Sequence, residues 1–557
     1  MQRLLMLLAI AGCVIAAGLQ ANEHKTGFNS TDLHIGAEPQ LFVDNWDIES
    51  VQSVTRRWYK PARQGDGPVL AKDKPWEIFP YFTYSNYCVL RDPKDGLFKC
   101  WYEDASMRQP GEWPSTTSRL LYAESRDGIR WEKPELDIVF YNGKPTNIVA
   151  GRDFGQGSSE KNPWPNEGVH SAAIIMDPNP PTPEERFRMW FTHETSQAGR
   201  TVHQVACAHS VDGKHWLPYP SGPTMGSTEN AGDVSTLWYD ADSRDFVMNT
   251  RKAPMSYVAW SDVNRKTHPL AFGWSPFYAP QRPDLMNKRR IFQTRSHDFI
   301  HWTEPLELLC PDDDWDNLDE QYYGMGQFQV GRQHFGTLGV FRQADNEMYV
   351  RLVYSRDGLH WSPADRGLPF LSPRGPAHWD AHMVSIVPAP IEVGGQLWFF
   401  HGGTSGHHDY WMSTEKLDVP EARDLAAVHF AMGLATLRRD GFCSLDTGDV
   451  RPGVIATRPV FSSGTALFIN ARCRAGGSIR VTLTDPNGQT LEGCELAKCD
   501  LFTGDDVSHK VTWQGRDLIP GANTFRRVVF HLRKAEIFSF RFAESDAEPR
   551  RKESNTR

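Results

Sequence analysis

A single acidic residue, with an aromatic side chain or a histidine nearby, recurs at intervals of roughly 60–90 residues through the first three quarters of the chain. At a sugar carbon, carboxylates act as general acid, general base or nucleophile, and aromatic rings stack on pyranose faces. We therefore expect a carbohydrate site in which Glu77, Glu167 and Asp233 supply the acid and base chemistry. The side chains expected to bind substrate share this recurrence or end a neighbouring strand: His170, Arg251, Glu320, Tyr323, Arg342, Asp380 and His401.

No motif specifies a metal or a cofactor, because none of the nine cysteines forms a pair with metal-ligand spacing. A divalent ion among the channel carboxylates stays open as an alternative. The formal charge of −9 is small for 557 residues, and lysines and arginines are scattered along the chain. This distribution argues against a nucleic-acid surface and leaves a carbohydrate as the expected partner. The oligomeric state is unknown at this point.

A repeated turn motif indicates the elements that would position these residues. Each copy follows a strand-like run and reads Ser-x-Asp-Gly-x-x-Trp, with Phe299 in place of glycine in one of them. Asp bonds the following backbone and Gly accepts a positive φ, which predicts a tight turn. We expect the turn containing Phe299 to differ slightly from the others. The four copies span residues 125–131, 210–216, 296–302 and 355–361.

Upstream of each turn motif lies a second predicted hairpin, and a fifth hairpin follows without the motif. Five repeats of about four short strands predict an all-β fold with a five-bladed β-propeller over residues 38–430. Six blades remain an alternative, because the unit from Asp233 to Pro305 is long. The first strand of each blade would line a central channel, so its polar residues would converge there. We expect the segment Leu41–Val43 to close the fifth blade.

The pattern changes after residue 438, where alternating strands are separated by Gly, Asp and Asn turns without the motif. Residues 438–545 are therefore predicted to form a C-terminal β-sandwich, and the charged residues 546–557 a disordered tail.

The first 21 residues have the basic start, apolar run and small-residue end of a secretory signal peptide. We expect a secreted or periplasmic protein without a membrane span, and acylation of Cys13 is the alternative to free export. Outside the cytosol, Cys88 with Cys100 and Cys494 with Cys499 are candidate disulfides. Buried free thiols are the alternative for both pairs.

Four features of the sequence carry a resemblance to known proteins: the segments Leu41–Asp44 and Asp73–Glu77, the Ser-Arg-Asp-Gly-x-x-Trp turns and Arg438–Phe442. Together they resemble exported bacterial proteins that are similar to glycoside hydrolase families thirty-two and forty-three. The resemblance implies a five-bladed propeller joined to a β-sandwich, with three acids in successive blades. By position, Glu77, Glu167 and Asp233 correspond to those acids. The Trp-Met-Asn-Asp-Pro and Glu-Cys-Pro motifs of family thirty-two are absent here, so fructan cleavage is not implied.

These features favour an exported glycosidase that cleaves a plant or algal oligo- or polysaccharide by carboxylate acid/base catalysis in the propeller funnel. A polysaccharide lyase, in which His170 or Tyr323 removes a proton beside a carboxylate, is one alternative. A non-catalytic glycan-binding protein is the other. The sequence does not indicate which sugar is cleaved, its linkage, the stereochemistry of the reaction or whether cleavage is exo or endo.

Overall fold

The computed structural model describes residues 34–545 except 109, 111–116, 156, 198–199, 226–231, 253–288, 313–315, 318, 343–344, 409, 413–418, 518 and 521–522. The predicted leader with Cys13 and the predicted tail lie outside the described residues. All regular elements within the described part are β-strands or short 3-10 turns, so the all-β prediction is confirmed. In the same part, no helix is long and apolar enough to cross a membrane.

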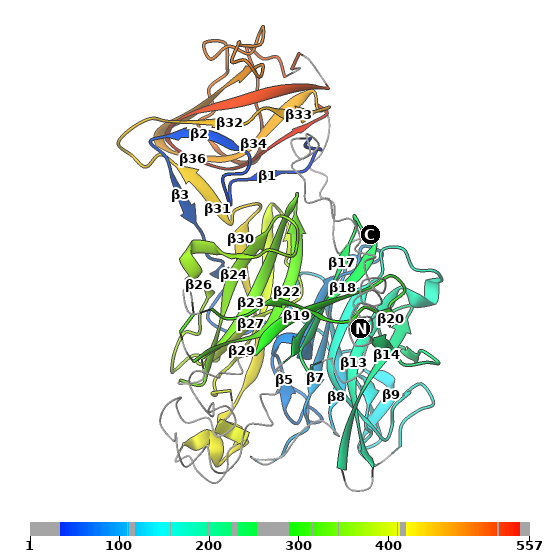
Figure 1. The fold of residues 1–557 in the computed structure, drawn as a ribbon. Helices are drawn as coiled ribbons and strands as arrows, with labels where there is room; N and C mark the ends of the chain where they lie inside the picture. Colours follow the sequence, from blue (N-terminus) through cyan, green and yellow to red (C-terminus); the bar gives the residue numbers. More distant parts are fainter. Residues whose placement is uncertain are drawn as a thin grey trace, which may run out of the picture.

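Five antiparallel units, here called the body, follow one another along the chain (Figure 1). The first contains β5 (Pro80–Tyr81), β6 (Tyr87–Arg91), β7 (Phe98–Asp104), β8 (Arg119–Ser125) and β11 (Ile148–Gly151), with the hairpin β9 (Leu136–Tyr141) and β10 (Lys144–Thr146) beside it. The second contains β12 (Gly168–Met176), β13 (Phe187–Gln197), β14 (Arg200–Ser210) and β15 (Leu217–Pro218). The third contains β16 (Thr224–Met225), β17 (Ser235–Asp240), β18 (Asp245–Lys252), β19 (Arg290–Ser296), β20 (His301–Trp302) and β21 (Leu306–Leu309).

The fourth and fifth units are joined into one ten-stranded sheet by a single parallel pairing, Met348 with Met383. The fourth contains β22 (Glu320–Val330), β23 (Gln333–Arg342), β24 (Glu347–Ser355), β25 (Ser362–Pro363) and β26 (Pro369–Leu371). The fifth contains β27 (Met383–Ile386), β28 (Ile391–Val393), β29 (Gln396–Thr404), β30 (Phe430–Arg438) and β4 (Ala62–Arg63). The hairpins expected from the sequence are all present as β6–β7, β12–β13, β17–β18, β22–β23 and β27–β29.

The four repeated turns are built alike. In the first, the Ser125 hydroxyl accepts from Gly128 N (2.9 Å), and Asp127 Oδ1 accepts from the amides of Ile129 and Arg130 (2.9 and 2.8 Å). Phe299 makes the same turn with φ 74°, against 72° at Gly128, so the expectation that its turn differs was wrong. The buried Phe299 ring packs on Trp302 (5.5 Å between centroids), which offsets the strain of a side chain at positive φ.

One contact links each unit of the body to the next, and another links the fifth unit back to the first. The linked residues are therefore arranged in a closed cyclic order. The contacts are Trp101 Nε1 to Gly213 O (2.6 Å), and ring pairs Trp190–Trp302 (5.4 Å), Trp238–His334 (5.6 Å), Phe328–Phe399 (6.4 Å) and Trp131–Phe400 (5.8 Å between centroids).

The strand that completes the fifth unit is β4, which pairs with β30, and not the segment Leu41–Val43. That segment instead contributes to β1, where Gln40 and Leu41 pair with Phe540 and Ser539. Both segments are too short to specify a distant partner by their pattern alone. The prediction of the closing strand was therefore wrong.

A nine-stranded sheet, here called the terminal lobe, combines the two ends of the chain (Figure 1). The predicted boundary at residue 38 placed its N-terminal strands in the body, and the pairings correct this. The lobe contains β1 (Gln40–Leu41), β2 (Ile48–Gln52), β3 (Thr55–Trp58), β31 (Cys443–Asp446), β32 (Gly453–Thr457), β33 (Val460–Ser462), β34 (Ala466–Thr484), β35 (Asp505–Lys510) and β36 (Thr524–Ala543).

The terminal lobe contacts the body at the end where the repeated turns lie. Arg356, in the turn of the fourth unit, donates to both carboxylate oxygens of Asp44 (2.9 and 2.7 Å). A shared apolar cluster joins Leu41 and Val43 of the lobe to Phe328 and Phe399 of the body. The opposite end of the body, where β22 and β27 begin, lies away from this contact.

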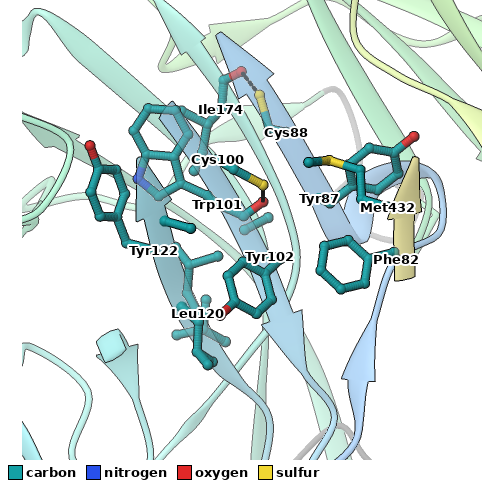
Figure 2. Packing of buried hydrophobic residues seen from close by; sticks show 14 of the residues in the cluster. Phe82, Tyr87, Cys88, Cys100, Trp101, Tyr102, Leu120, Tyr122, Ile174 and Met432 are labelled. Carbon is teal, nitrogen blue, oxygen red and sulfur yellow. Dashed lines mark hydrogen bonds between the residues drawn. The ribbon is translucent and has the colours of Figure 1, made fainter. Parts of the chain in front are cut away.

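The cysteines considered for disulfides are free thiols. Figure 2 shows Cys88 and Cys100 on adjacent strands with their sulfur atoms bonded in different directions, Cys88 to Ile174 O (3.2 Å) and Cys100 to Trp101 O (3.8 Å). Their registers differ by one residue, since Cys88 pairs with Trp101, and so the side chains face opposite sides of the sheet. Burial raises the pKa of the Cys88 thiol to about 12. The pair Cys494 and Cys499 is likewise reduced.

Candidate functional site

Charged and hydroxylated side chains from all five units of the body meet where the first strands begin. We call this group the axial cluster. It combines predicted residues with others that the sequence reasoning did not single out as site residues. Its members are Glu103, His170, Asp233, Arg251, Arg289, Tyr323 and His408.

Asp233 is the most accessible carboxylate of the axial cluster. It precedes β17, its side chain is 44% exposed, and it forms an ion pair with the buried Arg251 at the end of β18. Partial burial opposes ionisation, but the positive groups Arg251, His170 and Arg289 lower the pKa of Asp233 to about 2. Asp233 is therefore an ionised carboxylate at any pH near neutrality, and part of it faces outward.

His170 in β12 is held by a buried acid from the neighbouring unit. Its Nδ1 lies 2.7 Å from Oε1 of Glu103, which ends β7. The other Glu103 oxygen accepts from the amide of Ser171 (3.0 Å) and from Asn86 Nδ2 (2.6 Å). These bonds satisfy Glu103 and fix the imidazole ring, so Glu103 positions His170 and does not itself face a substrate.

Tyr323 in β22 supports the cationic side of the cluster. The guanidinium groups of Arg251 and Arg289 lie 4.4 and 5.2 Å from the centre of its ring, and its hydroxyl bonds Nε2 of His408 (2.8 Å). Only 6% of Tyr323 is exposed. Its ring is therefore occupied by cations and is not available to stack on a sugar.

The short 3-10 turn η2 (Tyr84–Asn86) forms the floor of the axial cluster. Ser85 Oγ donates to the carbonyl of Asp233 (3.2 Å), and Asn86 bonds Glu103, so one turn supports both acids. Tyr84 is fully buried against Gly324 and Gly339, where an added Cβ would lie 2.9 and 2.1 Å from its ring and hydroxyl. The two glycines therefore let the turn approach the inner strands closely.

Glu320 and Arg342 lie apart from the axial cluster, in an open cleft of about 470 Å³ in the fourth unit. Glu320 accepts from Asn317 N (2.9 Å) and the Tyr349 hydroxyl (2.9 Å), which occupies its carboxylate. Arg342 is 37% exposed and pairs with Asp345 (2.6 Å). Arg342 is thus the better placed of the two to bind an anionic group.

Asp380 and His401 are buried behind this cleft. Asp380 accepts from Arg63 (2.8 Å) and Arg374 (2.6 Å) and ties β4 to the fifth unit. The ring of His401 stacks on Trp379 at 5.4 Å between centroids, and burial lowers the pKa of His401 to about 3. Both side chains are enclosed, which favours structural roles over the predicted contact with substrate.

The remaining two predicted acids differ in their surroundings. Glu77 is buried, and it accepts from Lys133 Nζ (2.6 Å), the Tyr102 hydroxyl (2.6 Å) and the amides of Asp73 and Lys74 (both 2.8 Å). This geometry favours a structural role for Glu77. Glu167 immediately precedes β12, the strand that contains His170, and is partly buried.

Three residues of the axial cluster were missed as site residues by the sequence reasoning. Glu103 ends the second strand of its unit, as Arg251 and Arg342 do in theirs, so position in the repeat was a usable signal. Arg289 and His408 lie in connections outside the repeat, where no pattern marks them.

No protein-family model and no curated protein matches this sequence. The chain is similar in structure to an N-acetylgalactosamine deacetylase from F. plautii in complex with blood group B trisaccharide, at 16% identity and TM-score 0.41, over 70% of this chain and 96% of the other. It is also similar to a structure from the GH130 family, whose glycoside hydrolases target beta-1,2 mannosidic linkages in Candida mannan, at 14% identity and TM-score 0.38, over 71% and 96%. A third similar structure is a glycosyl hydrolase from Bacteroides ovatus, at 13% identity and TM-score 0.38, over 72% of this chain and 97% of the other. TM-scores below 0.5 assign neither a fold nor an activity to this chain.

Proposed function

We propose that the body is a five-bladed β-propeller, that the terminal lobe is a β-sandwich-like domain, and that the protein is exported after removal of residues 1–21. The closed order of contacts between the five units supports the propeller. In that arrangement the starts of the first strands surround one axis, which is where the axial cluster lies.

The proposed activity is that of a glycoside hydrolase acting on an oligo- or polysaccharide at the axial cluster. The observation that carries this proposal is Asp233, an outward-facing carboxylate that Arg251 and its neighbours keep ionised. In the reaction, Asp233 accepts a proton from the attacking water, and Glu167 donates one to the leaving glycosidic oxygen. His170, fixed by Glu103, orients a sugar hydroxyl beside them.

The proposed substrate carries anionic groups such as sulfate or uronate carboxylate. Arg251 and Arg289 are buried cations at the site. Arg342 is a partly exposed cation of the fourth unit, at the end of β23 that pairs with the start of β22. Guanidinium groups bind planar carboxylates and sulfate oxygens through paired hydrogen bonds.

A polysaccharide lyase is the second candidate, because one observation favours it. The hydroxyl of Tyr323 is bonded to His408 (2.8 Å) while two guanidiniums lie against its ring. A Tyr–His pair beside cations can remove a proton next to a uronate carboxylate, and the cations stabilise the resulting charge. The burial of Tyr323 places this candidate second.

The test is product analysis by chromatography with mass and ultraviolet detection. The mature protein is incubated with neutral, sulfated and uronic oligosaccharides, beside the variants Glu167→Gln, Asp233→Asn and, as a matched control in a repeated turn, Asp127→Asn. Hydrolysis gives two products whose summed mass exceeds that of the substrate by one water. We expect the rate to fall about 10²–10⁴-fold in both site variants and to stay unchanged in the control. Unsaturated products that absorb in the ultraviolet would establish the lyase instead. Binding without any product would establish a glycan-binding protein.

A further inference from the structure

A second group of ligating side chains lies at the junction of the fourth and fifth units, outside the axial cluster. It consists of Glu347 at the start of β24, His382 just before β27 and His407 after β29. One nitrogen or oxygen ligand atom of each lies within 4.8 Å of those of the other two. His382 Nδ1 is 2.9 Å from Glu347 Oε1, and the rings of the two histidines stack at 3.7 Å between centroids.

A fourth side chain completes an outer layer around this group. Glu421 in η8 (Pro420–Ala422) contacts Nδ1 of His407 with both carboxylate oxygens, at 3.0 and 3.1 Å. A carboxylate on one imidazole nitrogen fixes the tautomer and directs the other nitrogen toward a metal. Tyr410 stacks on the opposite side of the His407 ring at 4.3 Å. The orientation of His407 is thus set by two neighbours before any ligand binds.

The group is also accessible, since Glu347 lines the open cleft of the fourth unit and is 36% exposed. His382 and His407 are more enclosed, at 14% and 22%. A bound ion would therefore reach the histidines from the cleft and lose part of its hydration there. Access, a convergent ligand set and an ordered outer layer are the features expected of a metal site.

We propose that Glu347, His382 and His407 bind one divalent first-row transition ion, with Zn²⁺ as the probe. Two imidazoles and one carboxylate suit Zn²⁺ and its neighbours better than Ca²⁺ or Mg²⁺, which prefer oxygen ligands alone. Metal–ligand bonds of about 2.0–2.2 Å place ligand atoms up to about 4 Å apart, so small rotations of the three side chains complete the site. The remaining coordination positions would be filled by water or by a substrate oxygen.

The ion would join two units that otherwise pair through one bridge, Met348 with Met383, each adjacent in sequence to a proposed ligand. It would also act on the axial cluster, because His408, which bonds Tyr323, directly follows the ligand His407. Metal binding therefore stiffens the junction and positions His408. This inference is independent of the proposed reaction, since metal binding is measured without substrate.

The test is titration of chelator-treated full-length mature protein with Zn²⁺ by calorimetry, with metal content by mass spectrometry and the thermal midpoint recorded in parallel. We expect one Zn²⁺ per chain and a higher midpoint with the ion bound. His382→Ala and His407→Ala lose the binding, and Glu421→Gln weakens it by about 10–100-fold. His360→Ala is the matched control, because His360 also pairs with an acid (Asp357, 2.6 Å) but stands alone on the surface.

If a histidine variant fails to fold, His382→Asn and the Co²⁺ form of the wild type replace it. Visible d–d absorption of Co²⁺ that is lost in His382→Asn supports the site. Wild-type protein that takes up no Zn²⁺ or Co²⁺ at one equivalent overturns the proposal, and so does stoichiometric binding that both histidine variants retain.

Discussion

The two ends of the third unit carry the same kind of ion pair in different settings. At the turn end, Arg295 donates to Asp240 (3.0 Å), and Asp240 also accepts from the amides of Asp242 and Ser243 (3.1 and 3.4 Å). At the other end, Arg251 pairs with Asp233, whose side chain is 44% exposed against 13% for Asp240. The carboxylate of Asp240 is used up by hydrogen bonds within its own turn and has a structural role. The carboxylate of Asp233 is bonded by Arg251 and remains partly exposed.

The same contrast holds for the whole body. The repeated turns satisfy their hydrogen bonds within a few residues, so each is complete without its neighbours. The axial cluster is assembled from several units, and contacts such as that of Glu103 with His170 cross from one unit to the next. Groups gathered in this way are available for chemistry, while groups closed within one turn stabilise the framework.

The largest effect is expected from Arg251→Met. Without this cation the pKa of Asp233 rises from about 2, since burial is then opposed only by His170 and Arg289. We expect activity near neutral pH to fall about 10²-fold and the acidic limb of the pH–rate profile to move upward by at least about one unit. Arg295→Met removes the equivalent cation at the turn end and should change neither the activity near neutral pH nor the acidic limb of the profile. Equal losses of activity in the two variants would show that the two ion pairs do not differ in function.

The next effect concerns stability at the contact between the second and third units. Trp190 is almost fully buried and packs edge-to-face on Trp302. Trp190→Ala should lower the free energy of unfolding by about 3–5 kcal/mol, measured by urea denaturation. Activity per folded molecule should stay within about twofold of wild type. The partly exposed Trp131 offers a milder comparison, and a larger loss in Trp131→Ala would contradict the ranking by burial.

Glu77→Gln separates a structural acid from a catalytic one. The change removes the buried one of the two carboxylates that pair with Lys133 and leaves only the exposed Asp73, so we expect a loss of about 2–3 kcal/mol in unfolding free energy. Adding Lys133→Met should recover part of this loss, which a double-mutant cycle measures. If the variant folds with wild-type stability but has lost activity, Glu77 has a catalytic role and the structural assignment is wrong.

The smallest effect is a pH dependence of stability from His401. Its pKa is about 3 in the folded protein and near the ordinary 6.5 when unfolded, so the unfolded chain binds the extra proton between these values. Stability is therefore complete above pH 6.5 and falls with decreasing pH, by up to about 1.4 kcal/mol per unit. His401→Asn should flatten this slope between pH 6 and about 4. An unchanged slope would show that other groups set it.

The sequence predicted those parts of the fold that are encoded over short distances. The Asp turns and the five hairpins follow from segments that are neighbours along the chain, because each contains its own hydrogen bonds. The same reasoning failed at Phe299, where burial of the ring in the finished body outweighs the local preference for glycine. It also failed for Leu41–Val43, because short apolar strands do not specify a distant partner.

The candidate site was predictable only in part for a related reason. His170, Asp233, Arg251 and Tyr323 occupy repeat positions, and the structure brings them together. Glu77, Asp380 and His401 also satisfy the positional rule, but their enclosure depends on partners far away in the chain. His408 and two of the proposed metal ligands, His382 and His407, belong to loops, whose course is set by the packed units and not by local pattern.

The pairing of Gln40 with Phe540 has a consequence for the order of synthesis. The first strand emerges roughly 500 residues before its partner, so it stays unpaired until nearly the whole chain has been made. The five units can each form their local hairpins in the meantime, and the lobe closes last around its two ends. A chain cut short before β36 would leave β1 and β31–β34 without the strand with which each of them pairs, so an unfinished molecule would carry several open strand edges at once.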